Sequence, residues 1–464
     1  MIQSERVKML NQEEIQNKPY VIYWMQSSQR TQYNHALEFA VDYANLLEKP
    51  LIVYFGLTEK FPEANRRHLR FMIEGLLEVK ENLKRRGIRF IVMHCSPEVG
   101  AIKLAKEAAL LVTDRGYLRI EKSWRRALAD NAHCKVFQVE SNVLVPVEVA
   151  SMKEEYSAAT IRRKIEKRME EFALPLMERT LNYPSTHLEM QENEILFEDA
   201  RKILQALDLT DEVSEVKSFV GGAKEANKHF EDFLLNKLKH YAKYRNEPSM
   251  DYTSNLSPYL HFGQVSPLEL YLRLPEGFDE NKRVFIDELI VRRELAINFV
   301  EYQKHYDSYD SISSFAKVTL EKHRDDIRPW HYTLEQLEKG LTHDPYWNAA
   351  EMEMLATGKM NGYMRMYWGK KIIEWTETPE SAYEIALYLN NKYNIDGRDP
   401  SGFAGVAWCF GKHDRPWKER EVFGTVRYMN DKGLKRKFDM EAYLEKVKLM
   451  ISKEEKIENT ENFK

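Results

Sequence analysis

Cysteine is scarce in this chain, and long apolar runs are missing. Cys95, Cys134 and Cys409 are the three cysteines among 464 residues, and none has a cysteine or histidine partner at metal-ligand spacing. A disulfide framework and a zinc site are therefore excluded. No segment is long and apolar enough to cross a membrane, and residues 1–18 are charged, without the apolar core of a signal peptide. We expect an intracellular, cytoplasmic protein with no membrane partner and no metal.

The glycine-rich pattern G-x-G-x-x-G is also absent, which excludes the ordinary dinucleotide fingerprint. What the first third of the chain does contain is short apolar runs that alternate with amphipathic stretches. The apolar runs lie at 20–25, 51–55, 89–93, 110–113 and 135–139, and the amphipathic stretches at 33–49, 65–86 and 97–109. This alternation predicts a parallel sheet covered by helices on both faces. The carboxyl ends of such strands are common ligand sites, and residues 24–30 follow the first strand.

Composition divides the chain into two domains, as its length favours. Residues 20–150 are predicted to form a Rossmann-like α/β domain after an N-terminal extension at 1–19. The charged residues 151–214 are predicted to be a long linker, and residues 215–464 a mostly helical domain. The expected fold class is therefore α/β followed by all-α. The helical periodicity of the second domain covers 227–244, 267–272, 284–302, 334–339, 349–375 and 379–392.

Residues 359–375, KMNGYMRMYWGKKIIEW, are crowded with methionine and aromatic side chains. On a helix, Trp368 and Trp375 share one face, about 10 Å apart along the axis, and Trp347 lies just upstream. Such a stripe is more often core than a cofactor site. Arg365, however, stands inside the apolar run and needs an anionic partner. The segment is therefore predicted to surround a charged or redox-active group.

Two further stretches have the chemistry of nucleotide and nucleic-acid binding. Thr253 to Gly263, TSNLSPYLHFG, places Ser257 and a proline at a predicted helix start, where exposed N–H groups suit a phosphate. Tyr241 and Arg245 precede it, although such a turn alone is most often structural. Residues 411–437 contain roughly nine basic and four acidic side chains with Trp417, Phe423 and Tyr428 between them, which favours contact with nucleic acid over a plain solvated surface.

Taken together, these motifs resemble the photolyase and cryptochrome family. YAKYRNEP and TSNLSPYLHFG resemble the start of its flavin-binding region. FIDELIVRREL, MRMYWGKKIIEW and DGRDPSGFAGVAW resemble the class II cyclobutane pyrimidine dimer photolyases, and the likeness covers nearly the whole chain. It implies a helical FAD-binding domain, light-driven repair of pyrimidine dimers in DNA by reduced anionic FAD, and a monomer associated with the nucleoid. It also implies a deazaflavin antenna at the strand ends of the first domain.

The resemblance assigns FAD to a set of side chains in the helical domain: Tyr241, Arg245, Thr253, Ser254, Asn255, Leu256, Ser257, Arg292, Arg365, Asn390 and Asp396. Arg365 and Asp396 are expected to form an ion pair beside the flavin ring. Asn390 is expected to face the ring nitrogen that carries the proton, where an amide can donate or accept.

Other roles implied by the resemblance lie around the substrate. Glu288, Met366 and Trp408 are expected to contact the dimer, although Glu288 without the family match reads as an ordinary i,i+4 pair with Arg292. Electrons are expected to pass through tryptophans, with Trp368 next to the flavin, Trp347 intermediate and Trp375 outermost. The side chains expected to enter the space left by the extruded lesion are Arg415, Trp417 and Arg427.

Two alternatives within the family stay open. A (6-4) photoproduct photolyase usually needs a histidine beside the lesion, and Asn361 stands where many relatives carry that histidine. A cryptochrome-like blue-light sensor is expected to have a long C-terminal extension after the basic segment. Ser401 likewise replaces the asparagine that many relatives have in the D-P-x-G turn.

Overall fold

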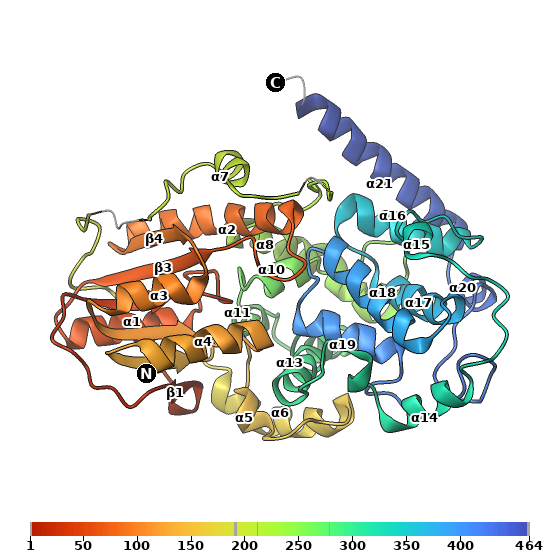
Figure 1. Ribbon diagram of the computed structural model, residues 1–464, viewed down its shortest axis with the longest axis horizontal. Coiled ribbons are helices and arrows are strands. Elements are labelled where there is room, and N and C mark those ends of the chain that lie inside the picture. Colours follow the sequence, from red (N-terminus) through yellow and green to blue (C-terminus); the bar gives the residue numbers. More distant parts are fainter. Residues whose placement is uncertain (1, 190–192, 211, 278, 462–464) are drawn as a thin grey trace.

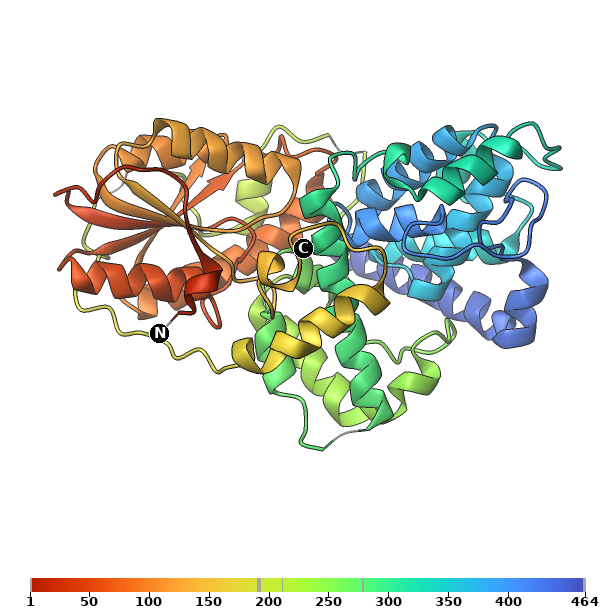
Figure 2. The same ribbon diagram turned by 90° about the horizontal axis from the view of Figure 1, so that it is seen from below.

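The computed structural model describes residues 2–189, 193–210, 212–277 and 279–461, with side chains up to 454. It has a sheet-containing half and a helical half that lie side by side (Figure 1 and Figure 2). This arrangement confirms the predicted fold class.

A six-stranded sheet forms the first half, in the order β1-β6-β5-β2-β3-β4. Five strands are parallel, and β1 pairs with β6 in the antiparallel direction. The five parallel strands correspond to the five apolar runs, because strands buried on both faces need apolar side chains throughout. The bounds of all six strands are β1 Val7–Met9, β2 Tyr20–Trp24, β3 Leu51–Leu57, β4 Arg89–His94, β5 Ala108–Asp114 and β6 Lys135–Val139. The antiparallel strand β1 lies in the predicted N-terminal extension.

Helices cover both faces of this sheet. α1 (His35–Leu46) and α2 (Arg66–Arg85) pack on one face, and α3 (Pro97–Ala105) and α4 (Arg119–Asn131) lie on the other. Alternate residues of each strand supply the two cores, so Val21 and Tyr23 face the first pair of helices, whereas Ile22 and Trp24 face the second. The sheet is thus enclosed, and its carboxyl edge is the part that stays open to the helical half.

The segment between the halves is partly helical and packs against both of them. It contains α5 (Val147–Ala150), α6 (Ala158–Phe172) and α7 (Ala200–Ala206). Helix α7 contacts α2 of the first half, whereas α5 and α6 contact helices of the second. The Ser185 hydroxyl bonds to the Leu51 carbonyl, and the backbone of Arg179 donates to Glu38 of α1 at 2.6 Å. A side-chain hydroxyl and a backbone N–H of residues 179–185 therefore have hydrogen-bond partners on the sheet domain.

The second half is helical throughout, with two short π-helical turns, η2 (Phe233–Lys237) and η4 (Asp287–Arg292). The short 3₁₀ turns of the chain are η1 (Ser4–Arg6), η3 (Leu238–His240) and η5 (Tyr309–Ser311). The α-helices are α8 Ala223–Asp232, α9 Tyr241–Tyr244, α10 Ser257–His261, α11 Pro267–Leu272, α12 Glu280–Ile286, α13 Arg293–Tyr302, α14 Ser314–Lys322, α15 Leu334–Glu338, α16 Pro345–Thr357, α17 Gly362–Trp375, α18 Pro379–Tyr393, α19 Pro400–Cys409, α20 Asp431–Lys437 and α21 Met440–Glu461.

The single helix predicted over 349–375 is wrong: it is two helices, α16 and α17. Gly358 ends α16 in the left-handed region, with φ +70°. The Asn361 side chain then accepts from the N–H groups of Tyr363 and Met364, which starts α17. A glycine C-terminus followed by an asparagine N-cap is a strong stop and restart, and it allows α17 to leave in a new direction.

Two buried arginines tie the halves together. Arg30, after β2, donates to the Gly263 carbonyl and to Asn142 Oδ1, both at 2.8 Å. Arg67 of α2 donates to the Tyr393 and Leu355 carbonyls at 2.7 Å, at the ends of α18 and α16. Each guanidinium satisfies carbonyl groups that helix ends and turns leave without intrahelical partners.

We predict that Gly263→Ala weakens this junction more than a matched glycine change. Gly263 has φ +64°, and a Cβ there would lie 1.9 Å from the Ser27 carbonyl oxygen. Gly277, with φ +89° and no neighbour within 4 Å of the added Cβ, is the control. Both variants should lose about 1–2 kcal/mol of unfolding free energy from the backbone conformation. Gly263→Ala should lose roughly 1–3 kcal/mol more from overlap. Parallel urea titrations test this, and equal losses would contradict it.

Candidate functional site

Helix α17 carries the centre of the candidate site. Its side chains divide into a buried set, which includes Trp368 and Trp375, and a half-buried set, which includes Arg365 and Met366. Most of the second half of the helix is buried, and the helix contacts α16, α18 and α19.

The expected ion pair is present. Arg365 Nη2 lies 3.0 Å from Asp396 Oδ1, and it also donates to Asn394 Oδ1 at 3.0 Å. Asn394 in turn donates to Asn390 Oδ1 at 3.2 Å, so the four side chains form one polar cluster. Arg365 Nε is buried without a hydrogen-bond partner among the described residues. A buried donor that lacks a partner is costly, and here it marks a place where a polar group from outside the chain fits.

Three tryptophans of α16 and α17 lie in contact with one another. The rings of Trp347 and Trp368 are parallel within 7°, with centroids 6.3 Å apart, and Trp347 meets Trp375 at 5.6 Å and 67°. The Trp347 indole N–H donates to the Trp368 carbonyl at 3.0 Å. All three are at most 2% exposed, and Tyr332 and His343 cover Trp375. The sequence therefore correctly grouped these rings although Trp347 is on α16.

Glu288 has a different partner from the one its spacing suggests. Its carboxylate pairs with Arg245 at 2.8 Å, whereas Arg292 pairs with Asp287 at 3.2 Å. The interpretation of Glu288 and Arg292 as an i,i+4 ion pair, which their spacing alone favours, is thus wrong. The reason is the π-helical turn η4, whose wider winding removes the α-helical register on which that pair depends. The Arg292 guanidinium lies 5.9 Å from the ring of Trp408, so two of the expected site residues touch.

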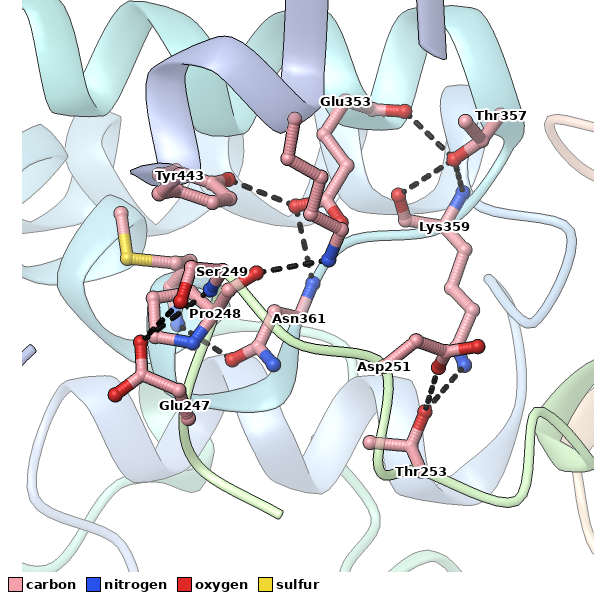
Figure 3. A network of polar contacts seen from close by, with 12 residues as sticks. Glu247, Pro248, Ser249, Asp251, Thr253, Glu353, Thr357, Lys359, Asn361 and Tyr443 are labelled. Carbon is pink, nitrogen blue, oxygen red and sulfur yellow. Dashed lines mark hydrogen bonds and ion pairs between the residues drawn. The ribbon is translucent and has the colours of Figure 1, made fainter. Parts of the chain in front are cut away.

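A lysine for which the sequence predicted no role, Lys359, contacts the turn before α10. Lys359 Nζ bonds to Asn255 Oδ1 and lies 3.4 Å from Thr253 Oγ1. Figure 3 shows its side chain reaching from the start of the α16–α17 connection toward Thr253 and Asp251. Burial lowers the pKa of Lys359 to about 8, against the opposing effect of Asp251. The feature of the sequence that could have drawn attention to Lys359 is its position directly after Gly358, the residue that ends α16.

Ser257 does not cap α10. It is the first helical residue, and Leu256 occupies the N-cap position without a side-chain hydrogen bond. Asn255 adopts the left-handed conformation, with φ +56°, a conformation that asparagine tolerates better than most residues. Thr253, Ser254, Asn255 and Ser257 are half-buried, so the turn has side chains at the edge of an accessible space.

Arg415, Trp417 and Arg427 come together at the surface. Both guanidinium groups lie over the Trp417 ring, at 5.5 and 5.1 Å from its centroid. Trp417 is 41% exposed, and large exposed aromatics flanked by cations suit stacking on a base and contact with phosphate. Phe423, by contrast, is only 1% exposed and belongs to the core, so its place between basic residues reflected packing.

A cavity lies at the carboxyl ends of the strands. Its wall includes Trp24, Gln26, Gln29 and Arg398. Polar atoms of these four residues are buried without partners in the described part of the chain, which points to a ligand with hydrogen-bonding groups.

Two kinds of feature are missing from the described residues. None of their helices has the length and hydropathy that a bilayer crossing requires. None of their His, Cys, Asp and Glu side chains cluster in threes as metal ligands.

The fold is that of the photolyases and cryptochromes. A Sulfolobus tokodaii photolyase, whose structure is described with two FAD molecules, has a TM-score of 0.70 against this chain. The match covers 92% of this chain and 89% of that one, at 17% identity, which establishes the fold.

Relatives that are similar in sequence identify the family to which the chain belongs. The deoxyribodipyrimidine photo-lyase of Methanothermobacter thermautotrophicus is 54% identical over 449 residues, which is 97% of this chain and 99% of the relative. The enzyme of the same name from Arabidopsis thaliana is 41% identical over 93% of this chain and 89% of its own. The DNA photolyase family model matches residues 21–184. The chain belongs to the DNA photolyase family, as the motifs had indicated.

Proposed function

We propose that this protein is a class II photolyase that uses light and reduced, anionic FAD to split cyclobutane pyrimidine dimers in DNA. The observation that carries the proposal is the arrangement on α17. Arg365, in its ion pair with Asp396, and Trp368, stacked on Trp347, lie about one turn apart on this helix. The identity of 54% with a named photo-lyase over almost the full length supports it.

The residues present fit a bound flavin. Arg365 has a buried Nε without a partner in the described part of the chain, and Asn390, 1% exposed, has an amide that can donate or accept. FAD, when bound and reduced, supplies the photochemical electron that opens the dimer, while the protein binds and orients it. The side chains that would hold it are Tyr241, Arg245, Thr253, Ser254, Asn255, Leu256, Ser257, Arg292, Arg365, Asn390 and Asp396.

Lys359 joins this set as the cation of the phosphate subsite. It lies against Thr253 and Asn255, the side chains proposed to meet the phosphates. Without an anion, burial disfavours its charge. A phosphate beside it would restore that charge and gain a charge-assisted hydrogen bond.

On the substrate side, Glu288, Met366 and Trp408 would contact the dimer. Arg245 holds the Glu288 carboxylate at 2.8 Å, which orients it toward the carbonyl and ring N–H groups of a bound pyrimidine pair. Arg415, Trp417 and Arg427 would fill the gap left in the duplex. A damaged site stacks weakly, so extruding it costs less than extruding a normal base.

The remaining parts of the proposal concern the setting of the enzyme. It acts as a monomer on chromosomal DNA inside the cell, with its domains divided near 150 and 214. A deazaflavin would occupy the cavity at the strand ends, where the unpartnered atoms of Trp24, Gln26, Gln29 and Arg398 offer hydrogen bonds.

Illumination of the purified, reduced protein with dimer-containing DNA tests the activity directly. Thymine absorbance should recover with light and stay constant in the dark. DNA that carries (6-4) photoproducts is the substrate control and should remain unrepaired. Normal flavin photochemistry without dimer recovery would favour the light-sensor alternative.

The relay predicts separate effects on photoreduction and on repair. Trp368→Phe should abolish light-driven reduction of oxidised flavin, because phenylalanine is not oxidised where indole is. Repair by chemically reduced Trp368→Phe enzyme should remain, since that reaction draws its electron from the flavin. Flavin absorbance under blue light measures the first and thymine recovery the second. Trp124→Phe, on α4 in the first half, is the control, and parallel loss of both activities would contradict the assignment.

The Lys359 assignment predicts a pH dependence of FAD affinity. With a pKa of about 8 in the free protein, a phosphate that raises this pKa causes proton uptake on binding above that pH. FAD affinity should therefore fall as pH rises through about 8, by up to about tenfold per pH unit. Lys359→Met should bind FAD more weakly at about pH 7, with a flatter pH profile. FAD titrations of the apoprotein, with exposed Lys339→Met as control, measure this, and equal slopes would overturn it.

A further inference from the structure

Glu351 is a buried carboxyl in direct contact with the tryptophan relay. It is 0% exposed, and its Oε2 accepts a hydrogen bond of 2.6 Å from the Trp368 indole N–H. Its other oxygen, Oε1, has no hydrogen-bond partner in the described part of the chain. A carboxyl in such a place is costly to keep, and no ordinary structural need of α16 explains it.

Burial favours the uncharged form of this carboxyl. Burial raises the pKa of Glu351 well above its ordinary value, and the negative charge of Glu338 acts in the same direction. The indole hydrogen bond opposes this but is a single neutral donor. An ionised carboxylate at full burial would need a cation or several donors, and neither is present among the described residues.

Helix α16 presents two groups to Trp368 at once. Trp347 and Glu351 are four positions apart and so share a face of α16. Trp347 stacks on the Trp368 ring and donates to its carbonyl at 3.0 Å, while Glu351 accepts from its nitrogen. Together these contacts fix the plane of Trp368 and its rotation within that plane, which a stacking contact alone does not determine.

We propose that Glu351 is a positioning residue of the electron relay, which holds Trp368 parallel to Trp347 and leaves the proton on the Trp368 nitrogen when the ring is oxidised. This inference rests on the function proposed above. With a bound, photoexcited flavin as the oxidant, Trp368 would give up one electron. Trp347 then gives one electron to Trp368 and is itself left oxidised. No proton moves in either transfer, so charge and atoms balance.

The neutral form matters because an oxidised indole is far more acidic than a neutral one. A carboxylate at 2.6 Å would accept its proton, and the neutral radical left on Trp368 would be a poorer acceptor for the electron of Trp347. The uncharged acid has no such capacity at the oxygen that accepts the bond. Glu351 therefore orients the ring without trapping oxidation at the first step.

Two variants of the FAD-loaded protein separate the roles. Glu351→Gln keeps a neutral acceptor of nearly the same shape, and Glu351→Leu removes it. We expect Glu351→Gln to photoreduce its flavin within about twofold of the parent, and Glu351→Leu to fall at least about threefold, because the ring loses its hydrogen bond. Ultraviolet resonance Raman spectra of the indole should show that bond in the parent and in Glu351→Gln only.

Transient absorption and infrared spectra complete the test. The first oxidised tryptophan should be the protonated cation in the parent and in Glu351→Gln, and a protonated-carboxyl band should disappear in Glu351→Gln. A deprotonated radical in the parent that becomes a cation in Glu351→Gln would make Glu351 a base and overturn the proposal, as would parent-like photoreduction in Glu351→Leu. If Glu351→Leu does not fold, the Glu351→Gln results decide.

Repair by chemically reduced enzyme separates this inference from the proposed function. Glu351→Gln should repair dimers at the parent rate, because the relay is not used. A parent protein that repairs no dimer would defeat the proposed function. A parent that repairs and photoreduces, together with parent-like photoreduction in Glu351→Leu, would defeat only the assignment of Glu351.

Discussion

The ion pair between Arg365 and Asp396 is the interaction on which the helical half depends. A guanidinium within the apolar stretch of α17 requires a carboxylate, and Asp396 can reach it only if the turn between α18 and α19 lies against α17. Asn394 and Asn390 then join the same cluster. This ion pair thus links α17 to the turn between α18 and α19, while Arg365 Nε stays buried without a hydrogen-bond partner among the described residues.

The break between α16 and α17 brings the tryptophans of the two helices together. A continuous helix from Trp347 to Trp375 would place Trp347 21 positions along one axis from Trp368, about 30 Å away. With Gly358 ending one helix and Asn361 starting the next, the chain reverses and the two rings stack at 6.3 Å. The same reversal brings Glu351 to the Trp368 nitrogen and Lys359 to Thr253 and Asn255.

How far the sequence predicted these features depends on the range of each interaction. The five parallel strands were predictable because each is a local apolar run, whereas β1, three residues long, has no such pattern. Arg365, inside an apolar run, indicated that an anionic partner was needed, and the resemblance to the photolyase family identified Asp396 as that partner. The partner of Glu288 was not predictable from spacing, because the π-helical turn η4 displaces the usual neighbours and offers Arg245 from another helix. Glu351 carries no signal in the sequence, because its burial depends on how α16 packs against α17.

Incomplete hydrogen bonding of buried polar atoms distinguishes two residues at α16 and α17 from the arginines at the junction of the halves. Burial lowers the pKa of Arg30 and of Arg67, but both donate to backbone carbonyls, which offsets the cost of their burial within the chain. Arg365 Nε and Glu351 Oε1, by contrast, are buried without a hydrogen-bond partner among the described residues. Because unpartnered buried polar atoms lower stability, their position beside the stacked tryptophans argues that chemistry as well as packing shaped this part of the fold.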